Sequence, residues 1–110
     1  MKKYCFDIDG VICKTFKNNY SQSKPNYKAI KKINELYFKK NIIILFTARF
    51  MGRSKENTKL AKKKAYKITI SQMSKWGVKY HKIIFGKPSY DVVVDDKSIF
   101  FKFNWWKNIK

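Results

Sequence analysis

Two pairs of aspartates are the residues of this sequence whose type and spacing best suit chemistry. The 110-residue chain has seven acidic residues against 26 Lys and Arg, and it places four of them in the pairs Asp7/Asp9 and Asp95/Asp96. Each pair lies at the end of an apolar run, a placement that surface solubility does not require. Clustered carboxylates repel one another unless a cation or a shared proton is present. Because hard Mg²⁺ prefers oxygen ligands and the chain has a single histidine, we expect Mg²⁺ rather than zinc.

The hydrophobic pattern predicts the elements that must position these aspartates. Continuous apolar runs predict four strands, at 4–6, 42–46, 81–85 and 92–94. Helical spacing predicts helices over about 25–40 and 56–67, and a capping-box pattern predicts a short third helix over 69–76. The polar stretch 14–24 predicts a loop or short hairpin. Helices alternating with fully apolar strands indicate a mostly parallel sheet covered on both faces, so we expect a three-layer α/β/α, Rossmann-like core.

Polar side chains follow all four predicted strands. In chain order, the strand ends carry Asp7 and Asp9, then Thr47, then Lys87, then Asp95 and Asp96. In open α/β sheets the working groups collect at the carboxyl ends of the strands. Carboxylates, one hydroxyl and one lysine at such an edge suit a divalent cation and a phosphoryl group.

These segments resemble, in order, the four motifs of the haloacid dehalogenase (HAD) superfamily. Residues 5–12 (CFDIDGVI) match its first motif, an apolar strand followed by DxDGxx, and 45–49 (LFTAR) resemble its second, a strand ending in Thr or Ser. Residues 86–88 (GKP) resemble the lysine motif, and 92–96 (VVVDD) resemble the apolar strand that ends in paired aspartates. The resemblance implies that residues 1–110 form one HAD-like hydrolase domain, a Mg²⁺-dependent phosphomonoester phosphatase.

The resemblance also implies a role for each matched residue. Asp7 would attack phosphorus and become an aspartyl phosphate, and Asp9 would protonate the leaving oxygen and then activate water. Thr47 would hydrogen-bond a phosphoryl oxygen, and Lys87 would neutralise charge on Asp7 and the phosphate. The Mg²⁺ ligands would be the Asp7 side chain, the Asp9 backbone carbonyl and one carboxylate of the Asp95–Asp96 pair. Substrate contacts would come from Thr47, Ala48, Arg49 and Lys87, and Arg53 is either a further substrate contact or an exposed residue.

The spacing of the motifs bears on substrate and assembly. Neither gap between motifs leaves room for the cap domain that many superfamily members carry. Capless relatives accept large substrates or close the site with a neighbouring subunit, so homo-oligomerisation is plausible. The compact form and the Thr-Ala-Arg and Gly-Lys-Pro contexts resemble small phosphatases of capsular and surface polysaccharide synthesis. A sugar phosphate or a similar small phosphorylated metabolite is the expected substrate.

Composition limits the other classes of function. No run approaches the roughly 20 apolar residues that cross a bilayer, and Asp7 interrupts any apolar leader, so we expect a cytoplasmic protein without a membrane partner. The net charge of +19 favours anionic partners. A phosphatase of nucleic-acid ends and a non-catalytic binding protein with this fold remain alternatives. The aromatic tail over 99–110 is expected to pack on the sheet edge or to form a subunit contact.

Overall fold

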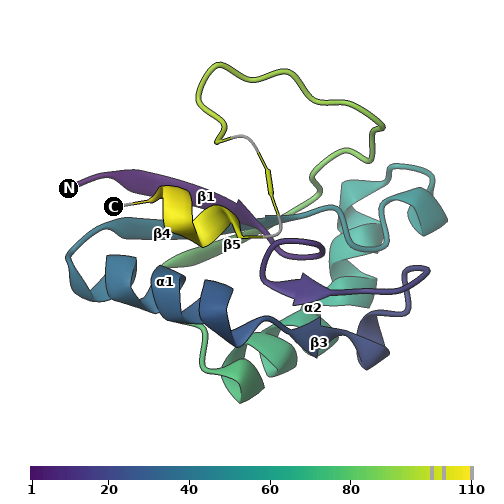
Figure 1. The fold of residues 1–110 in the computed structure, drawn as a ribbon. Coiled ribbons are helices and arrows are strands. Elements are labelled where there is room, and N and C mark those ends of the chain that lie inside the picture. Colours follow the sequence, from purple (N-terminus) through teal and green to yellow (C-terminus); the bar gives the residue numbers. More distant parts are fainter. Residues whose placement is uncertain (100, 103, 110) are drawn as a thin grey trace.

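Three parallel strands form the centre of the fold (Figure 1). The computed structural model describes residues 1–99, 101–102 and 104–109. The strands β1 (Lys3–Asp7), β4 (Ile42–Thr47) and β5 (Lys82–Phe85) lie in the order β1-β4-β5. Their register pairs Phe6 with Leu45, and Leu45 with Ile83. The structure confirms the α/β class, the first three predicted strands and their parallel direction.

Two helices connect these strands. α1 (Tyr27–Phe38) begins after Asn26, whose side chain accepts a hydrogen bond from the Ala29 amide at 3.2 Å. α2 (Thr58–Trp76) ends at Gly77, which adopts a left-handed φ of +72°. The prediction of two separate helices over this second stretch was wrong, because α2 is continuous through 69–72.

The short elements lie between the larger ones. β2 (Cys13–Lys14) and β3 (Lys24–Pro25) pair in an antiparallel hairpin, which confirms that prediction for the polar stretch 14–24. Three short 3₁₀ helices complete the described elements: η1 (Tyr20–Gln22), η2 (Gly52–Ser54) and η3 (Trp105–Asn108). No helix in the described part of the chain is long and apolar enough to span a membrane.

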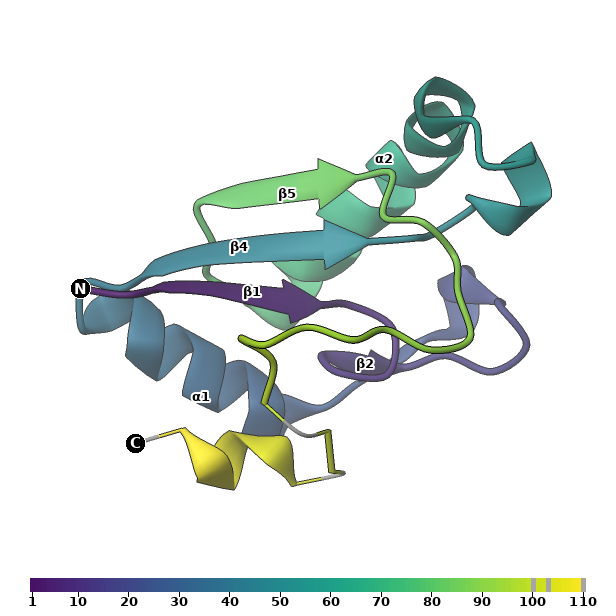
Figure 2. The same cartoon turned by 90° about the horizontal axis from the view of Figure 1, so that it is seen from above.

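Both helices lie against the same face of the sheet (Figures 1 and 2). Burial alternates accordingly along the strands: Phe6, Leu45 and Phe85 are buried, whereas Cys5 and Ile84 are exposed. The expected three-layer arrangement with helices on both faces is therefore not what the described residues form. The apolar strand sequences favoured double coverage, but the residues on the second face, such as Ile84, remain partly open to solvent.

The predicted fourth strand does not form. After β5 the chain makes a wide arc outside the sheet (Figure 1), and Val92, Val93 and Val94 are 79%, 59% and 94% exposed. Within the described residues, β1 pairs with β4 alone. An apolar run becomes a strand only where a neighbouring strand accepts its hydrogen bonds, and the described residues of the arc pair with no strand.

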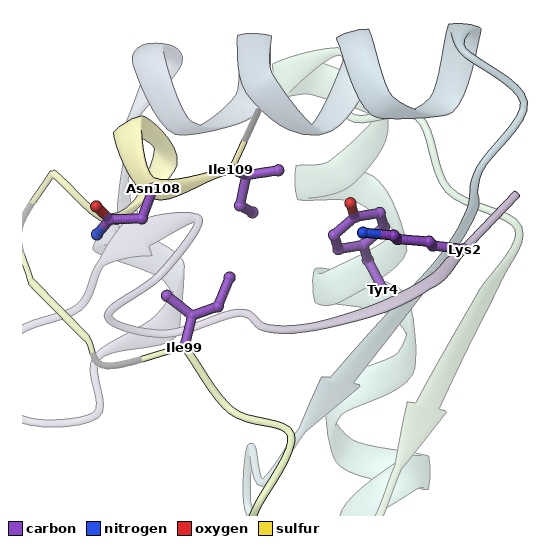
Figure 3. Close-up of a pocket in the computed structure, with 5 residues that line it drawn as sticks. All are labelled: Lys2, Tyr4, Ile99, Asn108 and Ile109. Carbon is purple, nitrogen blue, oxygen red and sulfur yellow. The ribbon is translucent and has the colours of Figure 1, made fainter.

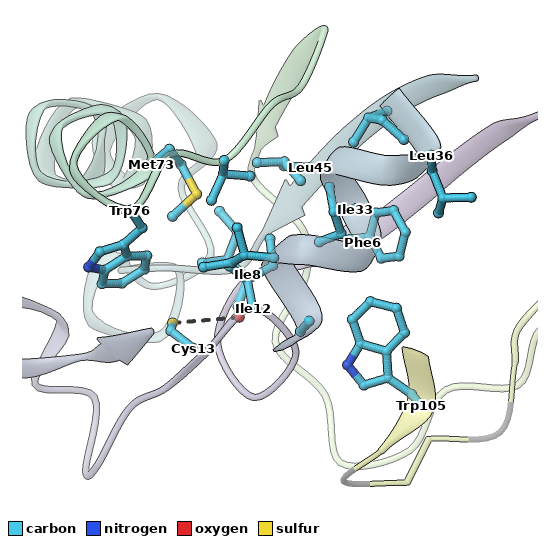
Figure 4. Packing of buried hydrophobic residues seen from close by; sticks show 14 of the residues in the cluster. Phe6, Ile8, Ile12, Cys13, Ile33, Leu36, Leu45, Met73, Trp76 and Trp105 are labelled. Carbon is cyan, nitrogen blue, oxygen red and sulfur yellow. Dashed lines mark hydrogen bonds between the residues drawn. The ribbon is translucent and has the colours of Figure 1, made fainter. Parts of the chain in front are cut away.

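One hydrophobic cluster joins the sheet, the helices and the end of the chain (Figure 4). Phe6 and Leu45 from the sheet meet Ile33 of α1 and Met73 of α2 in this cluster. Trp105 packs on Phe6 with ring centroids 5.2 Å apart, and its Nε1 donates to the Val11 carbonyl at 3.3 Å. This part of the aromatic tail packs on the domain, which agrees with the expectation of packing rather than with that of a subunit contact. Phe100 and Phe103, which belong to the same tail, lie outside the described residues.

Candidate functional site

Asp7 and Lys87 meet at the carboxyl edge of the sheet. Asp7 is the last residue of β1, and Lys87 follows β5 after one glycine. Lys87 Nζ lies 3.1 Å from Asp7 Oδ2, and the Ile8 amide donates to Asp7 Oδ1 at 2.9 Å. The Lys87 amide donates to the Thr47 carbonyl at 3.1 Å, which holds the lysine beside the end of β4. The structure therefore brings these two predicted site residues into contact, and their joint role stays a prediction.

Burial and charge act in opposite directions on this pair. Burial raises the pKa of the Asp7 carboxyl, and the nearby charge of Lys87 only partly opposes that effect. Burial lowers the pKa of Lys87, but its hydrogen bond to Tyr90 and the Asp7 charge outweigh this, so the net shift is upward. The lysine therefore stays charged beside a carboxylate that is less fully hydrated than a surface aspartate.

Asp9 forms the second ion pair of the site, with Arg49. Arg49 Nε lies 3.0 Å from Asp9 Oδ2, and Nη2 donates to Oδ1 at 3.0 Å. Thr15 Oγ1 also donates to Asp9 Oδ1, at 2.5 Å. The Arg49 side chain is fully buried, whereas that of Asp9 is 27% exposed. In this arrangement the arginine is enclosed by its own partners and contacts Asp9, and its role as a direct substrate contact stays a prediction.

Thr47 and Ala48 connect the two ion pairs through the backbone. Thr47 is completely buried, and its Oγ1 accepts a hydrogen bond from the Arg49 amide at 3.0 Å. Ala48 is half-buried, and its carbonyl accepts from the Met51 amide at 2.9 Å. In this arrangement the Thr47 hydroxyl shapes the turn that leads to Arg49.

The second aspartate pair belongs to an irregular segment rather than to the end of a strand. Asp95 and Asp96 are exposed in the arc that follows β5, where Asp95 Oδ1 accepts from the Lys97 amide at 2.8 Å. No three His, Cys, Asp or Glu residues within the described ranges are grouped closely enough to hold a metal ion. Asp7 and Asp9 each have a cationic partner instead. Mg²⁺ binding by the Asp7 side chain, the Asp9 backbone carbonyl and one carboxylate of the Asp95–Asp96 pair stays a prediction.

Several residues that support Asp9 were not singled out from the sequence. Ser23 Oγ lies 2.6 Å from Thr15 Oγ1, and Cys13 Sγ lies 3.6 Å from Asp9 Oδ1. On α2, Thr69 and Gln72 accept hydrogen bonds from Arg49 Nη1. The spacing of Thr69 and Gln72 predicted the start of a helix. Their polar side chains were therefore interpreted as helix caps rather than as partners of an arginine.

Arg53 lies in a different environment from Arg49. It is exposed, its Nη2 donates to the Asn18 carbonyl at 2.6 Å, and its guanidinium lies over the rings of Tyr20 and Phe50. These residues line a pocket of about 200 Å³. Arg53 is therefore the arginine that remains accessible to a ligand.

One pocket of the described residues does not coincide with the candidate site. It measures about 340 Å³ and lies between the first half of β1, Ile99 and η3 (Figure 3). Its lining residues are Lys2, Tyr4, Ile99, Asn108 and Ile109. None of the residues predicted to carry chemistry lines it, so we place the candidate site at the Asp7–Lys87 edge.

Comparison with known proteins supports the α/β architecture and tests no activity. No protein-family model matches the chain, and no curated protein matches it either. A crystal structure of a target protein from Vibrio cholerae is similar, with a TM-score of 0.83 and 25% sequence identity. The similarity covers 90% of this chain and 83% of that one. Such coverage supports the α/β architecture described above.

Proposed function

We propose that this chain is a phosphomonoester phosphatase in which Asp7 is the nucleophile. The observation that carries the proposal is the contact between the half-buried Asp7 carboxylate and Lys87, at the edge where Asp9 also lies. A carboxylate at a strand end, beside a positive charge, can attack an electrophilic phosphorus. The lysine stabilises the negative charge that develops on the phosphoryl oxygens, and such stabilisation supplies most of the catalysis in phosphoryl transfer.

The proposed reaction has two steps. Asp7 attacks phosphorus, the bond from phosphorus to the leaving oxygen breaks, and Asp9 transfers a proton to that oxygen. Asp9 then takes a proton from water, which attacks the aspartyl phosphate and releases inorganic phosphate and free Asp7. Among the described residues, Asp9 Oδ2 accepts a hydrogen bond from Arg49 Nε alone, which leaves this oxygen with capacity for a proton.

Mg²⁺ dependence stays a prediction, and no step above is assigned to a metal. The Asp7 side chain, the Asp9 backbone carbonyl and a carboxylate of the Asp95–Asp96 pair are the residues that would hold the ion, with water completing its shell.

A small phosphorylated metabolite such as a sugar phosphate is the proposed substrate. The strong positive charge favours an anionic substrate and also supports the second candidate, a phosphatase of nucleic-acid ends. Arg53, exposed beside Tyr20 and Phe50, is the candidate contact for the part of the substrate beyond the phosphate.

Hydrolysis of an aryl phosphate, with and without Mg²⁺, tests the proposal in the wild type, Asp7→Asn and Asp91→Asn. Asp91 is an exposed aspartate outside the site, so its variant controls for the loss of one negative charge. We expect turnover in the wild type and Asp91→Asn, and none in Asp7→Asn. Equal activity in all three purified proteins would refute the nucleophile. A folded wild type that neither hydrolyses phosphate esters nor traps a phosphate mimic on Asp7 would favour a non-catalytic binding protein.

A further inference from the structure

Arg49 is the most completely enclosed charged residue of the protein's core. It is 1% exposed, although it follows β4 in a loop where exposed basic residues are the usual expectation. A buried guanidinium is costly unless all its donors have partners. Here all three of its nitrogens donate to side chains from other elements.

The partners of Arg49 divide into two sets on opposite sides of the guanidinium. Nε and Nη2 donate to the Asp9 carboxylate, whereas Nη1 donates to Gln72 Oε1 at 2.6 Å and Thr69 Oγ1 at 3.2 Å. Both of the latter residues belong to α2. The planar group therefore links the loop after β1 to a rigid helix, and it can rotate only if several hydrogen bonds break together.

This anchoring is reinforced from a third direction. Gln72 Nε2 donates to the Tyr20 carbonyl at 2.6 Å, and the Arg49 guanidinium lies over the Tyr20 ring, 5.0 Å from its centroid. Hydrogen bonds to α2 and the face of the Tyr20 ring therefore both hold the Arg49 guanidinium in place. A lysine could supply the charge but not two nitrogens for the carboxylate and a third for the helix.

The two oxygens of Asp9 accept different numbers of hydrogen bonds. Oδ1 accepts hydrogen bonds from Arg49 and from Thr15, and Cys13 Sγ lies 3.6 Å away. Oδ2 accepts from Arg49 Nε alone among the described residues. The carboxylate is therefore oriented with one oxygen saturated and the other available for a proton.

We propose that Arg49 is a positioning residue that holds the Asp9 carboxylate with Oδ2 directed to the proton transfer of the phosphatase reaction. This inference rests on the proposed function, and it assigns Arg49 a role distinct from substrate binding. The proton moves from Asp9 Oδ2 to the leaving oxygen as the bond to phosphorus breaks. Arg49 itself exchanges no proton and forms no bond to the substrate.

Leaving-group dependence separates a positioning role from a merely structural one. p-Nitrophenolate leaves without a proton, whereas the alkoxide of glycerol phosphate needs one. Loss of a general acid therefore slows the alkyl ester far more than the aryl ester. A variant that only weakens the fold slows both esters by the same factor, because it lowers the amount of active enzyme.

The experiment measures kcat for both esters in the wild type, Arg49→Lys, Asp9→Asn and the double variant. We expect Arg49→Lys to lower kcat on the alkyl ester about 10²-fold, and much less on the aryl ester. Asp9→Asn should show the same pattern, and the double variant should lose little more than Asp9→Asn alone. Lys75→Arg, a Lys/Arg exchange at an exposed position in the last turn of α2, should leave kcat for both esters unchanged.

The outcomes distinguish the inference from the proposed function. Equal loss on both esters in Arg49→Lys would overturn the positioning role while leaving the phosphatase intact. No turnover of either ester by the wild type would overturn the proposed function and this role with it. If Arg49→Lys is unfolded at the assay temperature by circular dichroism, Thr69→Val replaces it, because this change of similar shape removes one of the two acceptors of Arg49 Nη1. The same unequal loss, smaller in size, is then expected, and an equal loss overturns the role.

Discussion

The two ion pairs of the candidate site differ in how deeply their cations are buried. The side chain of Lys87 is 16% exposed and that of Arg49 is fully buried. A partly exposed lysine can move with its carboxylate when a phosphate arrives, whereas the arginine is fixed by its own partners. At the residue scale, Lys87 therefore suits charge stabilisation in the reaction, and Arg49 suits the orientation of Asp9.

Lys87→Gln tests the charge assigned to the first pair. We expect kcat for an aryl phosphate to fall on the order of 10²-fold, because a positioned charge beside the phosphoryl group is lost. The melting temperature should change little, since partly exposed ion pairs contribute little to stability. Lys97→Gln, in the exposed arc, is the matched control. An unchanged kcat in Lys87→Gln would remove Lys87 from the mechanism.

Cys13 provides a prediction about pH. Burial, followed by the Asp9 charge, raises the pKa of this thiol to about 11. Because the thiolate is the reactive form, Cys13 should resist iodoacetamide in the folded protein at pH 8, and its labelling should accelerate only as the pH approaches 11. The labelling of Cys13 is measured by mass spectrometry in a Cys5→Ser variant, in which Cys13 is the remaining thiol. The folded variant is treated with iodoacetamide first, and the same treatment is repeated in guanidinium chloride. Rapid labelling of the folded protein at pH 8 would contradict the burial of Cys13.

At the scale of elements, the turn after β5 determines where Lys87 lies. Gly86 has a φ of +91°, a conformation that side chains rarely adopt, and a Cβ there would overlap the Thr58 Cγ2 methyl group at the start of α2. The end of β5 therefore packs closely against the first turn of α2. A shift of either element would move the lysine relative to Asp7.

Gly86→Ala should lower both stability and activity. The added methyl group forces Thr58 aside and places a non-glycine residue at positive φ, which costs about 1–3 kcal/mol. Adding Thr58→Ser removes Cγ2, so it should recover part of the lost stability but not the backbone strain. Urea unfolding and aryl phosphate turnover of the single and double variants measure the two effects. Identical stability of Gly86→Ala and the double variant would show that the overlap is relieved elsewhere.

At the scale of the whole molecule, the net charge of +19 surrounds a site that already contains two cations. Surface charge of one sign attracts anionic substrates over distances comparable to the Debye length, which is about 10 Å at 0.1 M salt. The two candidate substrate classes should respond differently to salt, because a nucleic acid contacts many lysines and a small phosphate ester contacts few.

Salt dependence of kcat/KM tests this difference. For glycerol phosphate we expect kcat/KM to fall several-fold between about 0.01 and 0.15 M salt, because KM rises while kcat stays nearly constant. Phosphocholine, whose cation offsets the phosphate, should show a shallower fall and serves as the control. A much steeper fall with a terminally phosphorylated oligonucleotide, together with a higher kcat/KM at low salt, would favour the nucleic-acid candidate.

Local patterns in the sequence determined much of the framework. The apolar runs of β1, β4 and β5 and the stop at Gly77 were predicted correctly, because strand period and helix termination depend on neighbouring residues. Parallel strands align their carboxyl ends, so the sequence also predicted that Asp7 and Lys87 would lie at one edge. That inference needed no knowledge of packing.

Only the tertiary structure decided how the polar residues are used. Thr69 and Gln72 had the pattern of a helix start, yet they lie within α2 as acceptors for Arg49, whose other partner, Asp9, is 40 positions away in the chain. Val92, Val93 and Val94 had the pattern of a strand but remain exposed. Periodicity reports the conformation that a segment favours by itself. Partners distant in sequence decide whether a strand pairs and whether a charged side chain is buried.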